Sequence, residues 1–153
     1  MKNKKIINAS PKEFNGIKFK SVLEVSVYKT LLQEGFNPEY ESYKYHIWEG
    51  FKPQIPFYIK DKKTKSLKLD NTKIIDITYT PDISFTFEGK LILIEVKPDF
   101  CNDVYPYKRK LFRKYLENNG KNVIFAQIGS KKNLIEFINI LRKNYGKFKE
   151  DKS

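Results

Sequence analysis

Cysteine and histidine are nearly missing from this chain of 153 residues, which contains one of each, Cys101 and His46. A single cysteine excludes an internal disulfide and a zinc site built from several cysteines. A single histidine argues against nucleases whose general base or metal ligands are histidines, and against hydrolases with a Ser-His-Asp triad. The chain also lacks a glycine-rich phosphate-binding loop, which argues against a nucleotide-dependent motor.

Long apolar runs are lacking as well. No segment approaches the roughly 18 apolar residues that a membrane span needs, and the N-terminus begins like a signal peptide but has no apolar core. We therefore expect a cytoplasmic protein, without a membrane as partner. Apolar residues make up 40% of the chain, enough for one folded domain with a hydrophobic core.

Acidic residues are few relative to basic ones. The 30 lysines and arginines outnumber 18 aspartates and glutamates, which gives a net charge of +12 and an isoelectric point near 9.6. Such a balance favours a polyanionic partner. Charge alone does not distinguish DNA from RNA or from an anionic membrane surface.

The stretch from Tyr79 to Asp99 has the most informative pattern in the chain. An alternating segment I-S-F-T-F, a turn E-G-K and an apolar run L-I-L-I follow one another, which predicts a β-hairpin. Asp82 precedes the first strand, and Glu95 and Lys97 end the second. Antiparallel pairing therefore brings the three side chains together at one end of the hairpin, with Glu95 and Lys97 on the same face.

Asp82 and Glu95 predict a divalent cation at that end of the hairpin. Burying a carboxylate is costly unless it is paired or bound to a metal. Mg²⁺, or Mn²⁺ in its place, prefers carboxylate oxygens together with waters and a substrate phosphate. Lys97 would then lie beside the scissile phosphate. The alternative interpretation is a salt-bridged hairpin end without chemistry.

The same residues resemble a known signature. Pro81-Asp82, followed thirteen positions later by Glu95-Val96-Lys97, is similar to the motif of the PD-(D/E)xK, or restriction-endonuclease-like, nucleases. This resemblance implies metal-dependent hydrolysis of phosphodiester bonds. It also implies that Asp82, Glu95 and Lys97 are catalytic, and that the carbonyl of Val96 is a further metal ligand.

Glu24 has two interpretations. The segment from Ser21 to Glu34 has the apolar periodicity of a helix, and Gly35 follows as a stop. Ser21 and Glu24 fit a capping box. However, N-G-I-K-F-K-S-V-L-E-V-S-V-Y resembles the G-x-x-F-x-S-x-x-E-x-x-x-Y run of some phage nucleases, which implies that Glu24 is a catalytic acid and metal ligand. We favour the second interpretation, with which a capping role is compatible.

Further elements follow from periodicity and stop signals. We predict a turn or hairpin at 14–19, strands at 37–48, 73–79 and 122–128, a helix capped by Asp103 and ending at Asn119-Gly120, and a last helix capped by Ser130. The segment 51–70 remains open between a structural loop and a basic flap over DNA.

This order predicts a single α/β domain with a mixed central sheet flanked by helices. It is also the αβββαβ core that the resemblance implies, with an extra C-terminal helix. We expect a flexible basic arm at 1–13, a nuclease domain at 14–144 and a charged tail at 145–153.

The helix after the hairpin carries five basic residues within seven positions and no acid among them. They predict contacts with a phosphate backbone, although such a run is often the solvated face of a helix. The residues are Lys108, Arg109, Lys110, Arg113 and Lys114.

From Phe14 to Lys114 the chain resembles phage Holliday junction resolvases of the endonuclease I type. The resemblance implies a DNA endonuclease selective for branched DNA, acting as a homodimer because two symmetric cuts need two sites. It also implies a location in the cytoplasm of the bacterial host cell if the chain is phage-encoded. Alternatives are a nuclease similar to Tn7-type transposition endonucleases, an RNA-directed nuclease, and a catalytically silent nucleic-acid-binding protein. The insertion at 51–70 departs from the family pattern.

Overall fold

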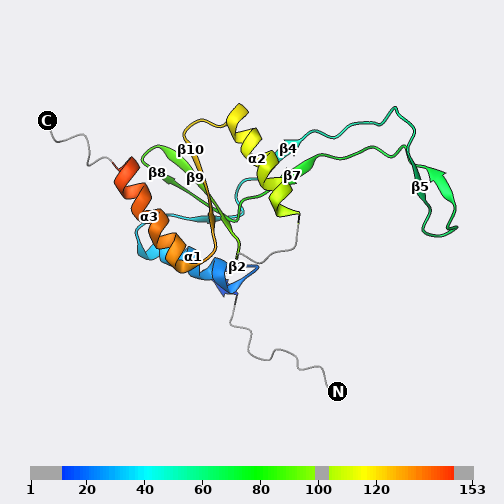
Figure 1. Ribbon diagram of the computed structural model, residues 1–153. Coiled ribbons are helices and arrows are strands. Elements are labelled where there is room, and N and C mark those ends of the chain that lie inside the picture. The colour runs from blue at the N-terminus through cyan, green and yellow to red at the C-terminus, as the bar shows by residue number, and fades with distance from the viewer. Residues whose placement is uncertain (1–11, 99–103, 147–153) are drawn as a thin grey trace, which may run out of the picture.

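A mixed four-stranded sheet lies at the centre of the computed structural model, which describes residues 12–98 and 104–146 (Figure 1). The strand order is β10 (Val123–Ile128), β9 (Lys90–Val96), β8 (Ile83–Phe87) and β3 (Glu39–Tyr40). Strand β9 is parallel to β10 and antiparallel to β8, which is antiparallel to β3. The prediction of an α/β fold with a mixed central sheet is confirmed.

Helices cover both faces of this sheet. Helices α1 (Val22–Gln33) and α3 (Lys131–Tyr145) cover one face, and α2 (Tyr105–Asn119) covers the other (Figure 1). Alternate residues of β9 divide between the two cores, because successive side chains of a strand point to opposite faces. Ile92 and Ile94 belong to the core under α1 and α3, whereas Leu93 packs in the core under α2.

Helices α1 and α3 start where the sequence predicted. The hydroxyls of Ser21 and Ser130 accept hydrogen bonds from the third residues of α1 and α3, which satisfies exposed amides of each first turn. Helix α2 begins after Val104, which makes no such bond, and the predicted cap Asp103 lies outside the described residues. Within residues 12–98 and 104–146, no helix has the length and apolar character to cross a membrane.

The predicted ends of the domain are only partly described. Helix α3 extends through Tyr145, the first residue of the segment predicted as a tail, and residues 147–153 lie outside the described chain. Of the basic N-terminal segment predicted at 1–13, residues 1–11 lie outside the described chain. Glu13 belongs to a small hairpin of β1 (Glu13–Phe14) and β2 (Ile17–Lys18). This hairpin is the one predicted at 14–19.

The single strand predicted at 37–48 is wrong. The segment forms β3, which pairs with β8, and β4 (Tyr45–Trp48), which pairs with β7 (Ile77–Tyr79) in a separate sheet. Between them Glu41 has a positive φ of 49° and donates its N–H to the carbonyl of Asp82. This bend redirects the chain. The strand predicted at 73–79 is correspondingly reduced to β7.

Segment 51–70 is neither an irregular loop nor part of the central sheet. Strands β5 (Tyr58–Lys60) and β6 (Leu67–Leu69) pair antiparallel at the end of two extended segments, joined nearer the body by a bridge between Phe51 and Ile74. We call residues 51–75 the arm. It projects well away from the central sheet (Figure 1).

Phe112 provides a test of the packing between α2 and the sheet. Its side chain is 0% exposed, and its ring lies 4.7 Å from that of Tyr79, centroid to centroid. We expect Phe112→Ala to lower the free energy of unfolding by about 3–5 kcal/mol through lost burial and a cavity. Urea denaturation measures this change. Tyr107→Ala, at an exposed position of the same helix, should alter stability by less than about 0.5 kcal/mol; equal effects would contradict the packing argument.

Candidate active site

The β8–β9 hairpin brings Asp82 and Glu95 together. Its two-residue turn has positive φ at Glu88 (48°) and Gly89 (75°), and such a turn sets the register of the strands. Ile83 pairs with Ile94, so Asp82, just before Ile83, lies opposite Glu95, just after Ile94. Beyond the last pair, an oxygen of Asp82 accepts a hydrogen bond of 2.7 Å from the backbone N–H of Val96.

Both carboxylates are buried, at 7% exposed for Asp82 and 8% for Glu95. The phenol of Tyr79 donates a 2.5 Å hydrogen bond to Glu95. Burial, followed by the nearby charge of Glu95, raises the pKa of Asp82 to about 8. Burial also raises the pKa of Glu95, against the opposing effects of the Tyr79 hydrogen bond and the charge of Lys97. Two acids are therefore held where both resist ionisation in the absence of a cation.

Lysines surround the two acids in a cleft of about 330 Å³. Lys20 approaches from the chain before α1, Lys97 from the end of β9, and Lys108 from α2. The ammonium of Lys97 lies 5.1 Å from the centroid of the Tyr105 ring, which also lines the cleft. The cleft thus combines oxygen donors with positive charge, the two features that a phosphate ester and its metal ion require.

Glu24 is buried on α1, the helix that packs on the other face of the sheet. Its carboxylate accepts hydrogen bonds from the phenol of Tyr40 at 2.7 Å and from the backbone N–H of Lys20 at 3.0 Å. Its own N–H donates to Ser21. The capping box is therefore displaced by one residue, since the side chain reaches Lys20 instead of the cap residue Ser21.

The charge of Glu24 nevertheless acts on the site. Burial is the main cause of the raised pKa of Asp82 and of Glu95, and Glu24 raises both further. The three acids thus share one electrostatic environment. A direct role of Glu24 as metal ligand stays a prediction.

Lys20, Tyr79 and Tyr105 are site residues that sequence reasoning missed. Lys20 forms an ion pair with Glu41 at 2.6 Å, and that hydrogen bond raises the pKa of the lysine. The available signals were adjacency to the motifs: Lys20 directly precedes the cap of the Glu24 helix, and Tyr79 stands three residues before Asp82. Neither signal indicates where a side chain points.

The predicted basic helix divides into two groups. Lys108 and Arg109 are half-buried; Lys108 lines the cleft, and Arg109 donates a 2.7 Å hydrogen bond to Gln127 of β10. Lys110, Arg113 and Lys114 are exposed on the outer side of α2. Contact of all five with phosphates stays a prediction.

Comparison with known proteins gives no relative from which a role for this site could be inferred. No family model, curated protein or solved structure matches the chain. The resemblance to PD-(D/E)xK nucleases therefore rests on the residues quoted above.

The donor set fits a hard divalent cation. In the described part of the chain, no cluster of three or more His, Cys, Asp or Glu side chains is arranged as a metal site. Mg²⁺ does not need such a cage, because it is typically bound by one or two carboxylates, several waters and a substrate phosphate. Asp82 and Glu95, buried together at a cleft lined by lysines, match that arrangement.

Replacing Asp82 by asparagine should stabilise the metal-free protein. The amide still accepts a hydrogen bond from Val96 but carries no charge beside Glu95. We expect a gain of roughly 1–3 kcal/mol in the free energy of unfolding. Because the folded pKa of about 8 lies above the ordinary value of 3.8, the gain should be full above pH 8 and should vanish below pH 3.8.

Denaturation in EDTA across this pH range checks the expectation, with Asp76→Asn as control. Hydrogen bonds from Gly50 and His46 lower the pKa of Asp76, so its replacement should destabilise the protein. Destabilisation by Asp82→Asn at pH 8 would contradict the view that this site is strained when ionised.

Proposed function

We propose that this protein is a metal-dependent DNA endonuclease of the PD-(D/E)xK type. The observation that carries the proposal is the buried pair of Asp82 and Glu95 facing a cleft that Lys97 also lines. The strands of the central sheet and the helices α1 and α2 add support. Apart from β4 to β7, which lie outside that sheet, they follow one another as α1, β3, β8, β9, α2 and β10, the αβββαβ order that the resemblance implies.

In this proposal Asp82 and Glu95 hold Mg²⁺ or Mn²⁺, with the carbonyl of Val96 and the carboxylate of Glu24 as further candidate ligands. The cation, when bound, polarises the scissile phosphate and lowers the pKa of a water molecule. Tyr79 fixes the orientation of Glu95 through its hydrogen bond, and the N–H of Val96 does the same for Asp82.

In the same proposal, lysines provide positive charge for the phosphate. Lys97 is the candidate to orient the attacking water or to neutralise charge that develops on the phosphate oxygens. Its position is defined by Tyr105 on one side, and its charge acts on Glu95 on the other. Lys20 and Lys108, which line two other walls of the cleft, are the candidates to bind neighbouring phosphates.

Selectivity for branched DNA belongs to the same proposal. It is supported by the resemblance to phage junction resolvases and by the net charge of +12, which suits a substrate that presents several duplex arms.

A cleavage assay tests the proposal. A synthetic four-way junction and a linear duplex of the same sequence are incubated with the protein in Mg²⁺ and in EDTA. We expect paired symmetric nicks on the junction, loss of cutting in EDTA, and a decrease of at least about 100-fold for Asp82→Ala, because a metal ligand is removed. Glu136→Ala, an exposed change on α3, should cut like the wild type.

The outcomes separate the parts of the proposal. Metal-dependent cutting of both substrates keeps the nuclease and removes the junction selectivity. Tight binding without cutting, in Mg²⁺ and in Mn²⁺, would contradict the enzymatic function and leave a nucleic-acid-binding protein.

Tyr79→Phe tests how the acids are positioned. Loss of the hydrogen bond to Glu95 should reduce the cleavage rate by about 10–100-fold and raise the Mg²⁺ concentration needed for half-maximal rate. Tyr45→Phe is the matched control, since Tyr45 packs in the same aromatic cluster, 5.1 Å from Phe112 between ring centroids. A rate loss that added Mg²⁺ does not relieve, or an equal loss in the control, would argue against this role.

A further inference from the structure

The tip of the arm is strongly basic. Five of the nine residues from position 60 to position 68 are lysines, and all five are exposed. Asp61, the one acid there, is occupied within the turn: it accepts hydrogen bonds from the N–H of Lys63 and the hydroxyl of Thr64. The tip is therefore a formed hairpin turn that presents positive charge at a distance from the body (Figure 1).

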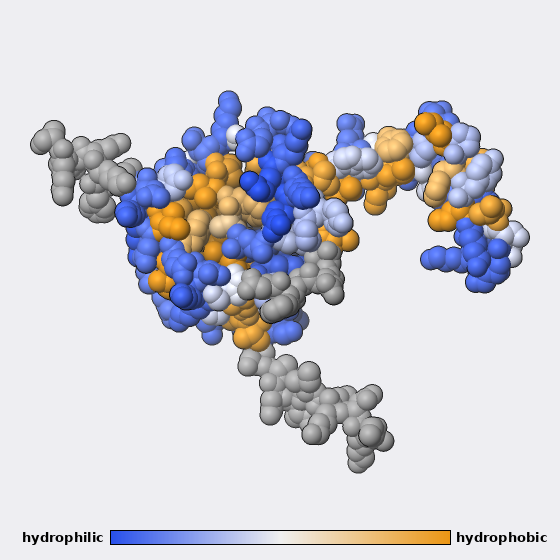
Figure 2. All heavy atoms as spheres, in the orientation of Figure 1, coloured by the Kyte–Doolittle hydropathy of each residue, from blue (hydrophilic) through white to orange (hydrophobic). Residues whose placement is uncertain are grey.

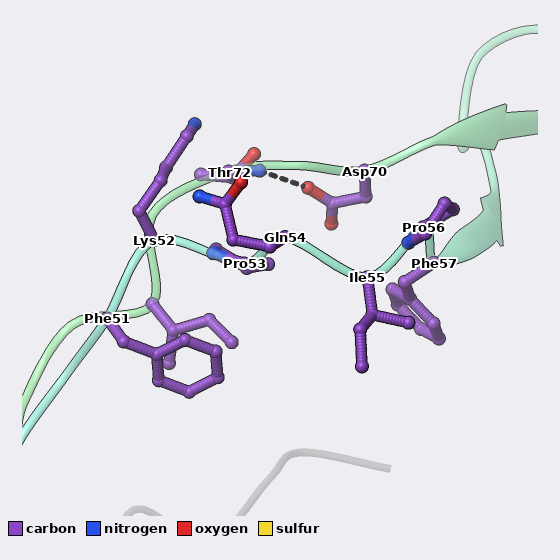
Figure 3. A pocket seen from close by; sticks show the side chains of 10 residues that line it. Phe51, Lys52, Pro53, Gln54, Ile55, Pro56, Phe57, Asp70 and Thr72 are labelled. Atoms are coloured by element: carbon purple, nitrogen blue, oxygen red, sulfur yellow. Dashed lines mark hydrogen bonds between the residues drawn. The ribbon is translucent and has the colours of Figure 1, made fainter.

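The stem of the arm is apolar on one side. Figure 3 shows Phe51, Ile55 and Phe57 pointing to one side, while Lys52 points to the other. These apolar residues line a hollow of about 680 Å³, and Ile55 is 84% exposed. Hydrophobic and hydrophilic residues alternate along the projecting arm in Figure 2. Apolar surface of this extent on a projecting element indicates a binding surface.

We propose that the arm is a second nucleic-acid contact, which follows a groove of the duplex whose backbone enters the cleft, with the tip lysines on phosphates. This inference rests on the proposed function and extends it to how the substrate is held. A two-stranded β-ribbon has the width that a major groove admits. The apolar stem would meanwhile be removed from water against sugars and base edges, as apolar side chains are in other DNA complexes.

The arm is poorly suited to pair with a second copy of the chain. Pro53 and Pro56 lie in its stem, and proline lacks the N–H that adding a strand requires. Lysines on the edge of a ribbon oppose edge-to-edge pairing, and two tips brought together would repel each other.

The length of the arm gives the inference a geometric test. Residues 51–60, fully extended, span at most about 33 Å. One turn of duplex DNA is about 34 Å long. The tip can therefore contact phosphates up to roughly one helical turn from those at the base of the arm, and a duplex much shorter than one turn cannot reach both the cleft and the tip.

The experiment measures binding of two fluorescent duplexes in EDTA, as a function of salt. One has about 6 base pairs, closed by a hairpin loop so that it stays paired and is shorter than one helical turn, and the other has about 25 base pairs. We expect Lys62→Gln combined with Lys63→Gln to weaken binding of the longer duplex by about tenfold and to lower the salt slope by about 2, with little change for the shorter one. Lys121→Gln combined with Lys143→Gln removes the same charge at exposed positions off the arm and should have a small effect on both.

Three results would overturn the inference. Equal binding of the longer duplex by the tip variant and the wild type would contradict the arm contact. The proposed nuclease function would stand if the same samples cut DNA in the presence of Mg²⁺. The arm would be assigned to self-association by two results together: light scattering shows a dimer that Phe57→Ser converts to a monomer, and the tip variant binds DNA with unchanged affinity. A wild type that binds neither duplex nor a four-way junction removes the inference together with the proposed function.

Discussion

Burial of two neighbouring carboxyl groups is the constraint around which this site is built. Asp82 and Glu95 occupy adjacent positions at one end of the hairpin, and burial is the main cause that raises the pKa of each. The charge of Glu95 raises the pKa of Asp82 further, whereas a hydrogen bond with Asp82 lowers the pKa of Glu95. A hydrogen bond from the backbone and one from Tyr79 hold the pair in place, but neither cancels two negative charges. The two buried acids therefore cost stability, a cost that the proposed cation would offset.

The alternation of side chains along β9 decides on which face of the sheet Glu95 lies. Leu91 and Leu93 pack toward α2, and Glu95 follows in the same alternation. The cleft is consequently lined by the start of α2, with Tyr105 and Lys108. Glu24 belongs to α1 on the opposite face, which explains why its carboxylate is bound by Tyr40 and Lys20 while its charge still acts on the pair.

The elements that the sequence predicted correctly are those that interactions between nearby residues determine. A two-residue turn and alternating apolar residues determine the β8–β9 hairpin, and serine caps determine where α1 and α3 begin. The split between β3 and β4 depends instead on a positive φ at Glu41 and a hydrogen bond to Asp82, 41 residues away along the chain. Tyrosine alternation on both sides of this bend conceals it. The partners of Glu95 and Glu24 were likewise beyond prediction, because they depend on where rings from other elements point.

The paired strands of the arm were not predicted, because lysines and prolines in this pattern are typical of a loop. Specific contacts nevertheless hold the base of the arm. Asp76 accepts hydrogen bonds from the N–H of Gly50 and from His46, the one histidine of the chain. A side chain at Gly50 would collide with the carbonyl of Ile74, so the two strands approach as closely as their backbones allow. A trailing loop has no need of such contacts. These contacts fix the base of the arm, which is what the proposed contact of its tip with a duplex would require.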